Sequence, residues 1–127
     1  MKFIFNSDTR ECAKNDIDVF QEEAKRTLRS DLPYEMVCSN MCMGLSGETG
    51  EVVDALKKHI YQGKDLDINE IIEEVGDVLW YVANLCNVNN ITMRECMEGN
   101  MEKLKKRYPN GFSIEDALAR VDKQGEK

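Results

Sequence analysis

The chain has 127 residues, of which 42% are apolar and 32% charged, a composition typical of one folded domain rather than of a disordered chain. Its 24 acidic and 17 basic residues give a formal net charge of −7, the opposite of the balance that binds DNA or RNA polymers. No apolar run approaches the roughly 20 residues of a membrane span, and no secretory leader precedes the first polar residues. We therefore expect a cytoplasmic protein with no membrane or nucleic-acid partner.

The spacing of apolar residues predicts helices throughout the chain, because their 3.6-residue period recurs and no strand-like alternation competes with it. The four main helices are expected at about residues 17–29, 34–61, 67–87 and 92–108, and a short helix at 113–121. Short connections favour antiparallel neighbours. The sequence thus predicts an all-α, four-helix-bundle-like fold in a single domain, residues 1–127, with its core at about 16–113.

Two local patterns refine this prediction. Asp67 followed by Glu70 forms a capping box at the start of the third helix. Gly44, Gly47 and Gly50 lie inside the second helix, where each costs about 1 kcal/mol relative to alanine. Glycines at these positions would let a neighbouring helix or a ligand approach the backbone closely, or would mark a break in the helix.

The second helix carries acidic side chains where a buried face is expected. Its apolar face consists of Met41, Leu45, Val52 and Leu56. At about 100° per residue, Glu48 lies within about 60° of the centre of this face, and Glu51 lies at its edge. A buried carboxylate must be protonated, paired with a cation or bound to a metal.

The third helix repeats this arrangement. Its apolar stripe consists of Ile71, Ile72, Val75, Val78, Leu79, Val82 and Cys86. Glu74 and Asp77 flank the stripe on one side, with Tyr81 one turn further along, whereas Glu73 projects almost opposite. Glu74 is therefore expected to face the second helix.

Two acids on each of two packed helices would place four carboxylates around one cavity. Such close like charges cannot all ionise without a compensating cation, and oxygen ligands suit Mg²⁺, Mn²⁺ or Ca²⁺. We predict a Mg²⁺ site, with Mn²⁺ as a second choice, whose metal-binding and catalytic residues are Glu48, Glu51, Glu74 and Asp77. The competing interpretation is that these acids are solvated on helix surfaces, as glutamates usually are.

Other metal chemistry fits the sequence less well. A di-iron bundle needs Glu-x-x-His motifs, whereas the sole histidine, His59, has Leu56 three residues before it. We expect His59 to lie in the core. The five cysteines contain no CxxC pair and are expected to be reduced core residues.

The fourth helix adds a basic edge beside a predicted buried stripe of Met93, Met97, Leu104 and Tyr108. Asn100, Lys103 and Arg107 lie on one border of this stripe and could hold phosphate groups, although cations near a helix C-terminus also simply favour its dipole. On the second helix, Lys58 lies beside Glu51 and is a further candidate.

Taken together, these residues resemble the MazG-related nucleotide pyrophosphohydrolases of the all-α NTP pyrophosphatase superfamily. The segments that carry the resemblance are Gly44-Leu45-Ser46-Gly47-Glu48-Thr49-Gly50-Glu51, Lys57-Lys58, Glu74-Val75-Gly76-Asp77-Val78-Leu79-Trp80-Tyr81 and Asn100-x-x-Lys103-Leu104-x-x-Arg107-Tyr108-Pro109-x-Gly111-Phe112-Ser113. The ordered set covers most of the chain, from about residue 21 to 122.

The resemblance implies Mg²⁺-dependent hydrolysis of nucleoside triphosphates, either dNTPs or non-canonical NTPs, to monophosphate and pyrophosphate, as nucleotide-pool house-cleaning. It assigns the metal to the four acids and implies substrate contacts by Lys58, Tyr81, Asn100, Lys103 and Arg107. It also implies a homo-oligomer, a homodimer or a homotetramer. The alternatives are a specialised member, such as a dUTPase or a phosphoribosyl-ATP pyrophosphohydrolase, and a non-enzymatic helical metal-binding interaction module.

Overall fold

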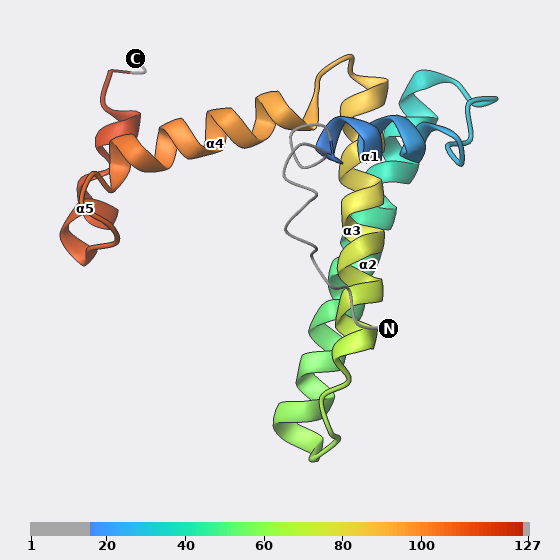
Figure 1. Cartoon of the computed structure of the whole chain (residues 1–127), viewed down its shortest axis with the longest axis horizontal. Helices are drawn as coiled ribbons and strands as arrows, with labels where there is room; N and C mark the ends of the chain where they lie inside the picture. The colour runs from blue at the N-terminus through green and yellow to red at the C-terminus, as the bar shows by residue number, and fades with distance from the viewer. Residues whose placement is uncertain (1–15, 126–127) are drawn as a thin grey trace, which may run out of the picture. The chain divides into compact units, whose positions relative to one another are not determined.

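The computed structural model describes residues 16–125, which form five α-helices (Figure 1). These are α1 (Asp16–Lys25), α2 (Tyr34–Gln62), α3 (Ile68–Val88), α4 (Met93–Arg107) and α5 (Ile114–Ala119), and the short 3₁₀-helix η2 (Val121–Lys123) follows them. These residues contain no β-strand, only a single bridge between Pro109 and Gly111. The all-α prediction is therefore confirmed. None of the helices in this range has the length and apolar character that crossing a membrane requires.

The helix ends follow local sequence signals. α2 begins directly after Pro33 and stops at Gly63, whose φ of 71° lies in the left-handed region and whose N–H donates to the Lys58 carbonyl. At the start of α3 the Asp67 carboxylate accepts a hydrogen bond from the Asn69 N–H at 2.9 Å. The predicted partner in the capping box is wrong, because the Glu70 carboxylate lies 3.1 Å from the Lys64 ammonium instead.

The chain divides into two compact units, the first ending at Met93 and the second beginning at Arg94. In the first unit α3 packs against both α1 and α2, and α2 and α3 run side by side along their length (Figure 1). The second unit holds α4 and α5. The four-helix bundle and the single domain therefore stay predictions, whereas the packed pair α2 and α3 is present in the first unit.

The core of the first unit joins α1 to α3. Ala24, Ala83, Cys86 and Met93 form a buried cluster. The Asn84 side chain is fully buried and donates to the Ala24 carbonyl at 3.0 Å, so its polar group is satisfied. On the same side, the Trp80 indole N–H donates to the Thr27 hydroxyl at 2.8 Å. Trp80 also packs against the buried cluster, so it has a packing role.

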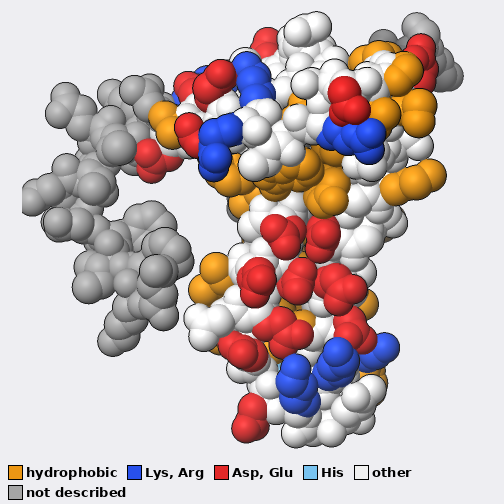
Figure 2. All heavy atoms as spheres, turned by 90° about the vertical axis from the view of Figure 1, so that its right-hand side faces the viewer, with side chains coloured by type: hydrophobic (Ala, Val, Ile, Leu, Met, Phe, Trp, Pro, Cys, Tyr) orange, Lys and Arg blue, Asp and Glu red, His pale blue; other side chains and the backbone are white. Residues whose placement is uncertain are grey.

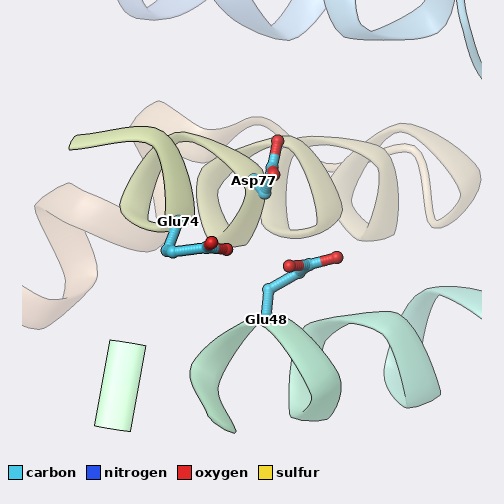
Figure 3. Close-up of side chains that lie close together, drawn as sticks. All are labelled: Glu48, Glu74 and Asp77. Carbon is cyan, nitrogen blue, oxygen red and sulfur yellow. The ribbon is translucent and has the colours of Figure 1, made fainter. Parts of the chain in front are cut away.

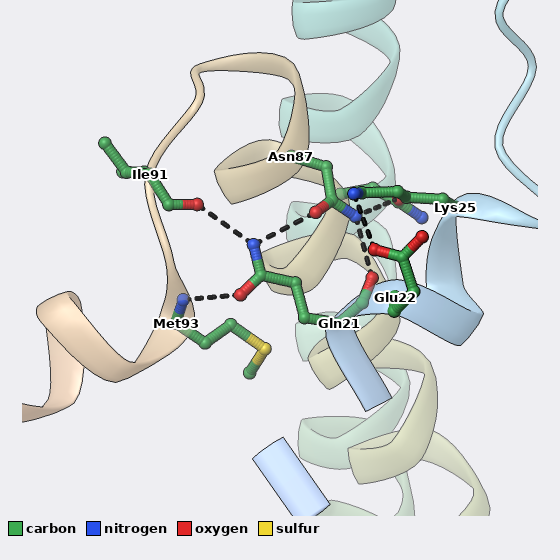
Figure 4. A network of polar contacts seen from close by, with 7 residues as sticks. Gln21, Glu22, Lys25, Asn87, Ile91 and Met93 are labelled. Carbon is green, nitrogen blue, oxygen red and sulfur yellow. Dashed lines mark hydrogen bonds and ion pairs between the residues drawn. The ribbon is translucent and has the colours of Figure 1, made fainter. Parts of the chain in front are cut away.

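A network of amides fixes the turn between α3 and α4 (Figure 4). The buried Gln21 carboxamide donates to the Ile91 carbonyl at 2.9 Å and to the Asn87 side-chain oxygen at 3.0 Å, and it accepts from the Met93 N–H at 2.7 Å. Since Met93 is the first residue of α4, one α1 side chain satisfies backbone groups that the turn leaves without helical partners.

Some side chains expected in the core are exposed in this chain. Six residues of the predicted buried stripes are between 39% and 48% exposed, namely Leu56, Ile72, Val75, Leu79, Met97 and Leu104. The prediction that they are buried is therefore wrong for the single chain. On α2 and α3 the physical reason is that a helix buries a residue only where another helix covers it, and three helices leave one side of this pair uncovered.

Several polar or reactive residues that were expected in the core are also exposed. His59 is exposed near the end of α2, where its Nδ1–H donates to the Lys64 carbonyl at 2.8 Å. Cys42 and Cys96 are also exposed, whereas Cys86 is buried and Cys38 is half-buried, all of them free thiols. The prediction of a core position is thus wrong for His59, Cys42 and Cys96. Cys12 lies outside the described residues.

Candidate metal centre

Three carboxylates converge between α2 and α3 (Figure 3). Glu48 extends from α2, and Glu74 and Asp77 extend from α3, where their three-residue spacing places them on one face. Each of the three side chains offers an oxygen, and these oxygens all lie within 4.8 Å of one another. Glu48 and Glu74 are half-buried and Asp77 is exposed, so the site is open to a ligand from solvent.

A close contact between the two helices lies one turn before Glu48. The Tyr81 ring of α3 packs directly onto Gly44 of α2, where a Cβ atom would overlap the ring. The ring also meets Trp80 edge-to-face, with the centroids 4.9 Å apart. The expected close approach at the second-helix glycines thus occurs at Gly44, whereas a Cβ at Gly47 would meet nothing within 4 Å.

The acids of both helices act on one another electrostatically. The pKa of the Glu74 carboxyl is raised from its ordinary value, first by burial and then by the negative charges of Glu48, Glu51, Asp77 and Glu73. Glu51 therefore contributes to the same field, although its oxygens are not among the three that lie within 4.8 Å. Figure 2 shows acidic side chains gathered on one face of the molecule over α2 and α3, with lysine or arginine side chains beside them.

The chemistry of this donor set fits a hard divalent cation. All three converging ligand atoms are carboxylate oxygens, and no histidine or cysteine of residues 16–125 shares the cluster. Mg²⁺ commonly binds to one or two protein carboxylates and keeps positions for water or phosphate oxygens. A cation at this place would also offset the mutual repulsion that raises the pKa of Glu74.

Lys58 lies close enough to the acidic cluster to interact with it but is held by another residue. Its ammonium contacts the Asp54 carboxylate at 2.5 Å, and Lys57 reaches the same carboxylate at 3.1 Å. The pKa of Lys58 is raised mainly by this hydrogen bond from the ammonium to Asp54, with smaller contributions from Glu70 and Glu51. Glu51 was the neighbour expected for Lys58, and Asp54 was missed, although an i, i+4 acid–base pair on a helix is a recognisable signal in the sequence.

The basic edge of α4 belongs to the second unit, where its members have different surroundings. Asn100 lines one shallow cavity with Cys96, Met97 and Met101. Lys103 lines another, of about 340 Å³, with Gly99, Glu102, Lys106, Asp122 and Lys123. The two residues thus face different cavities of this unit.

Arg107 already has a strong partner in its own unit. Its guanidinium forms two hydrogen bonds to the Asp122 carboxylate, at 2.7 and 2.6 Å, and the Asp122 side chain is only 2% exposed. This contact lowers the pKa of Asp122 to about 2 and raises the pKa of Arg107. Asp122 could not be predicted as the partner of Arg107, because no spacing rule links two residues separated by a turn and a short helix.

Comparison with known proteins finds a family that covers most of this chain. The family model of the MazG nucleotide pyrophosphohydrolase domain matches residues 38–121, which include α3, nearly all of α2 and all of α4. A curated relative, the gene 37 protein of Mycobacterium phage L5, is 37% identical over 78 residues, which cover 58% of this chain and 68% of the phage protein. No solved structure matches this chain.

Proposed function

The chain belongs to the MazG nucleotide pyrophosphohydrolase domain family, and on this premise we propose that it is a Mg²⁺-dependent hydrolase of nucleoside triphosphates. The reaction takes up one water molecule, breaks one phosphoanhydride bond and gives a nucleoside monophosphate and pyrophosphate. The proposed substrates are dNTPs or non-canonical NTPs, and the proposed role is to clear them from the nucleotide pool.

The convergence of Glu48, Glu74 and Asp77 carries the proposal. An acidic protein with a net charge of −7 repels a triphosphate unless a cation lies between them. The acids of α2 and α3, with Glu51 at the edge, would hold this cation where the triphosphate can share it. When bound, Mg²⁺ would orient the phosphate oxygens and offset the charge that develops on them as the bond breaks.

The protein groups have separate proposed tasks. Glu48 orients the attacking water, because it lies between the helices and its carboxylate can accept a proton from that water. Lys58 and Tyr81 are the substrate contacts proposed in the first unit, and Asn100, Lys103 and Arg107 are those proposed on α4. The Arg107 guanidinium binds Asp122 through Nε and Nη2, and its third nitrogen, Nη1, is proposed to donate to a phosphate oxygen.

The test is pyrophosphate release by the purified full chain with Mg²⁺ present. Glu48→Gln and Asp77→Asn should each lower turnover at least about a hundredfold. Even the replacement of a residue that only supports a metal ligand lowers metal affinity or activity tenfold to a hundredfold. Glu73→Gln is the matched control, because it removes an equal charge from an exposed neighbour on α3. Near-normal turnover in both site variants would refute the proposed function.

A panel of nucleotides separates this proposal from its alternatives. Release of pyrophosphate from several dNTPs or from damaged nucleotides supports the house-cleaning function. Turnover of dUTP alone, or of phosphoribosyl-ATP alone, would identify a specialised enzyme instead. A non-enzymatic metal-binding module would be stabilised by Mg²⁺ or Ca²⁺ and would hydrolyse none of these compounds.

We further propose that the protein works as a homodimer or a homotetramer. Support comes from apolar side chains of α2 and α3 that stay exposed in the single chain, among them Val53, Ile60, Ile72 and Leu79. Exposed apolar residues in such number favour burial against another subunit. Sedimentation equilibrium should give a mass of two or four chains, and a monomer at micromolar concentration would contradict this proposal.

A further inference from the structure

Two lysines lie at the end of the helix pair where the chain turns from α2 to α3. Lys58 is near the C-terminal end of α2, and Lys64 is in the connection to α3, residues 63–67. The backbone joins them, because the Lys64 N–H donates to the Lys58 carbonyl at 3.2 Å. Figure 2 shows basic side chains directly beside the acidic ones of this helix pair.

Acidic neighbours hold both ammonium groups near the candidate metal centre. The Lys58 ammonium contacts Asp54 at 2.5 Å. The Lys64 ammonium contacts Glu70 at 3.1 Å, and the charge of Glu70 also acts on Lys58. Glu70 precedes Glu74 by four residues, a rise of about 6 Å along α3. A phosphate chain that shares a cation with the acids can reach across this distance.

Glu51 interacts with both the acids and the lysines. Its charge adds to burial in raising the pKa of the Glu74 carboxyl, and it adds to the Asp54 contact in raising the pKa of the Lys58 ammonium. Glu51 and Lys58 are seven residues apart, two helical turns, so they leave α2 on the same face. On α3, Glu70 and Glu74 also share a face. The lysines therefore extend the side of the helix pair that carries the acids.

Both ammonium groups can bind a phosphate without leaving their carboxylates. Within residues 16–125, Lys58 and Lys64 each contact one carboxylate, whereas a lysine ammonium has three donors. The Lys58 side chain is 39% exposed and that of Lys64 is 51% exposed, so a ligand can approach them from solvent. Exposed ion pairs stabilise a fold by at most about 1 kcal/mol, so pairing alone gives these lysines little structural role.

The opposite direction along the helix pair offers a neutral group instead. Tyr81 lies one turn beyond Asp77 on α3, and its ring packs onto Gly44 of α2. The acids thus lie between two lysines on one side and an aromatic ring on the other. This difference in charge gives a bound triphosphate a preferred direction.

We propose that Lys58 and Lys64 bind the β- and γ-phosphates of the nucleoside triphosphate, an inference that rests on the proposed function. These two phosphates carry most of the negative charge of a triphosphate, and ammonium groups bind phosphate oxygens as point charges. The pyrophosphate end of the substrate then lies toward the α2–α3 connection, and the nucleoside lies toward Tyr81. Asp54 and Glu70 hold the two ammonium groups in place.

The first test measures binding by calorimetry with Mg²⁺ present. The probes are inorganic pyrophosphate and the monophosphate dAMP, which are the two ends of a substrate. Lys64→Ala and Lys58→Ala should each weaken pyrophosphate about tenfold, since a hydrogen bond to a charged group contributes about 1.5 kcal/mol or more. Both variants should bind dAMP within about twofold of wild type.

Lys57→Ala is the matched control. Lys57 contacts the same Asp54 carboxylate, at 3.1 Å, but it lies about 100° around α2 from Lys58. This variant should bind both probes as wild type does. Wild type that does not bind pyrophosphate, unchanged pyrophosphate binding in either site variant, or an equal loss for both probes would overturn the proposal.

The second test separates binding from folding at Lys64. Lys64→Ala should melt close to wild type, because the ion pair with Glu70 is partly exposed. Lys64→Arg keeps the positive charge and should bind pyrophosphate within about threefold of wild type. If the arginine variant melted as wild type does but lost as much affinity as the alanine variant, a phosphate contact at this position would be excluded.

The two proposals fail in distinguishable ways. If wild type hydrolyses no nucleotide, the proposed function fails and the direction of the substrate fails with it. If wild type hydrolyses nucleotides with Mg²⁺ while the lysine variants bind pyrophosphate as tightly as wild type, only the placement of the phosphates is wrong.

Discussion

At the scale of single residues, Glu74 is the side chain on which the acidic cluster acts most clearly. Its pKa is raised because burial and the charges of Glu48, Glu51 and Asp77 disfavour its ionised form. A carboxyl whose pKa is raised by folding destabilises the folded state above that pKa, so this destabilisation is present at neutral pH and is relieved by protonation or by a bound cation.

We therefore predict that Glu74→Gln raises the melting temperature at pH 7 when EDTA removes divalent cations. The same variant should lose most of the stabilisation that Mg²⁺ gives to wild type, because one ligand oxygen loses its charge. Thermal unfolding of both proteins, with and without Mg²⁺, measures the two effects. A variant that is less stable in EDTA but gains as much from Mg²⁺ as wild type would contradict the prediction.

The Arg107–Asp122 pair affects stability in the opposite direction, because it stabilises the folded state at neutral pH. The pKa of Asp122 is lowered to about 2, and a carboxyl lowered by folding contributes stability above its unfolded pKa of 3.8. This contribution should be complete above about pH 5 and should be lost as the pH falls toward 2. At that pH the Arg107 guanidinium, whose side chain is only 15% exposed, no longer has a charged partner, and an unpaired, largely buried charge destabilises the folded state.

The prediction is that Asp122→Asn lowers the melting temperature at pH 7 and that the difference from wild type disappears near pH 2. Melting curves between pH 7 and pH 2 check it. Asp31→Asn is the control, because the Arg29–Asp31 pair is about two-thirds exposed and should matter much less. If the melting temperatures of Asp122→Asn and wild type differed by the same amount at every pH from 7 to 2, the ion pair would not be the cause of the difference.

At the scale of elements, two glycines that open onto free space limit the stability of α2. Gly47→Ala should stabilise the helix by about 1 kcal/mol, since no atom opposes the added methyl group. Urea unfolding measures this gain.

Gly50→Ala tests the same point at a second position. A methyl group there also meets no other atom, so this variant should be stabilised by a similar amount. A lower stability than wild type in both variants would contradict the prediction.

The helices themselves could largely be predicted from sequence. The period of apolar residues gives their existence, and Pro33, Gly63 and Asp67 give ends within about a residue of those observed. The convergence of Glu48 with Glu74 and Asp77 was also predictable, because acids spaced by three residues share a face and two such faces meet when the helices pack.

What the sequence could not supply was the partner of each polar side chain. Lys58 was expected beside Glu51, yet it pairs with Asp54, which is one turn away rather than two. Arg107 pairs with Asp122 through a turn whose path no periodicity encodes. Likewise, helical periodicity identifies an apolar face but not what covers it, and Ile72 and Leu79 are therefore exposed in the single chain.

At the scale of the whole molecule, the candidate metal centre depends on one pair of helices. α2 and α3 pack side by side in the first unit, and this packing alone creates the acidic cluster. The family match extends over residues of both units, from residue 38 to residue 121. A second subunit over the exposed apolar side chains of α2 and α3 would stabilise the helix pair that holds the site.

The most direct test of the central claim is Mn²⁺ binding to the full chain, followed by electron paramagnetic resonance of the free ion. Wild type should bind Mn²⁺ and release it to excess Mg²⁺, and Glu48→Gln on α2 and Asp77→Asn on α3 should each weaken that binding at least about tenfold. Glu73→Gln should bind as wild type does. If Glu48→Gln and Asp77→Asn both hold Mn²⁺ as tightly as wild type, the two helices do not form a shared metal site, and the account is wrong.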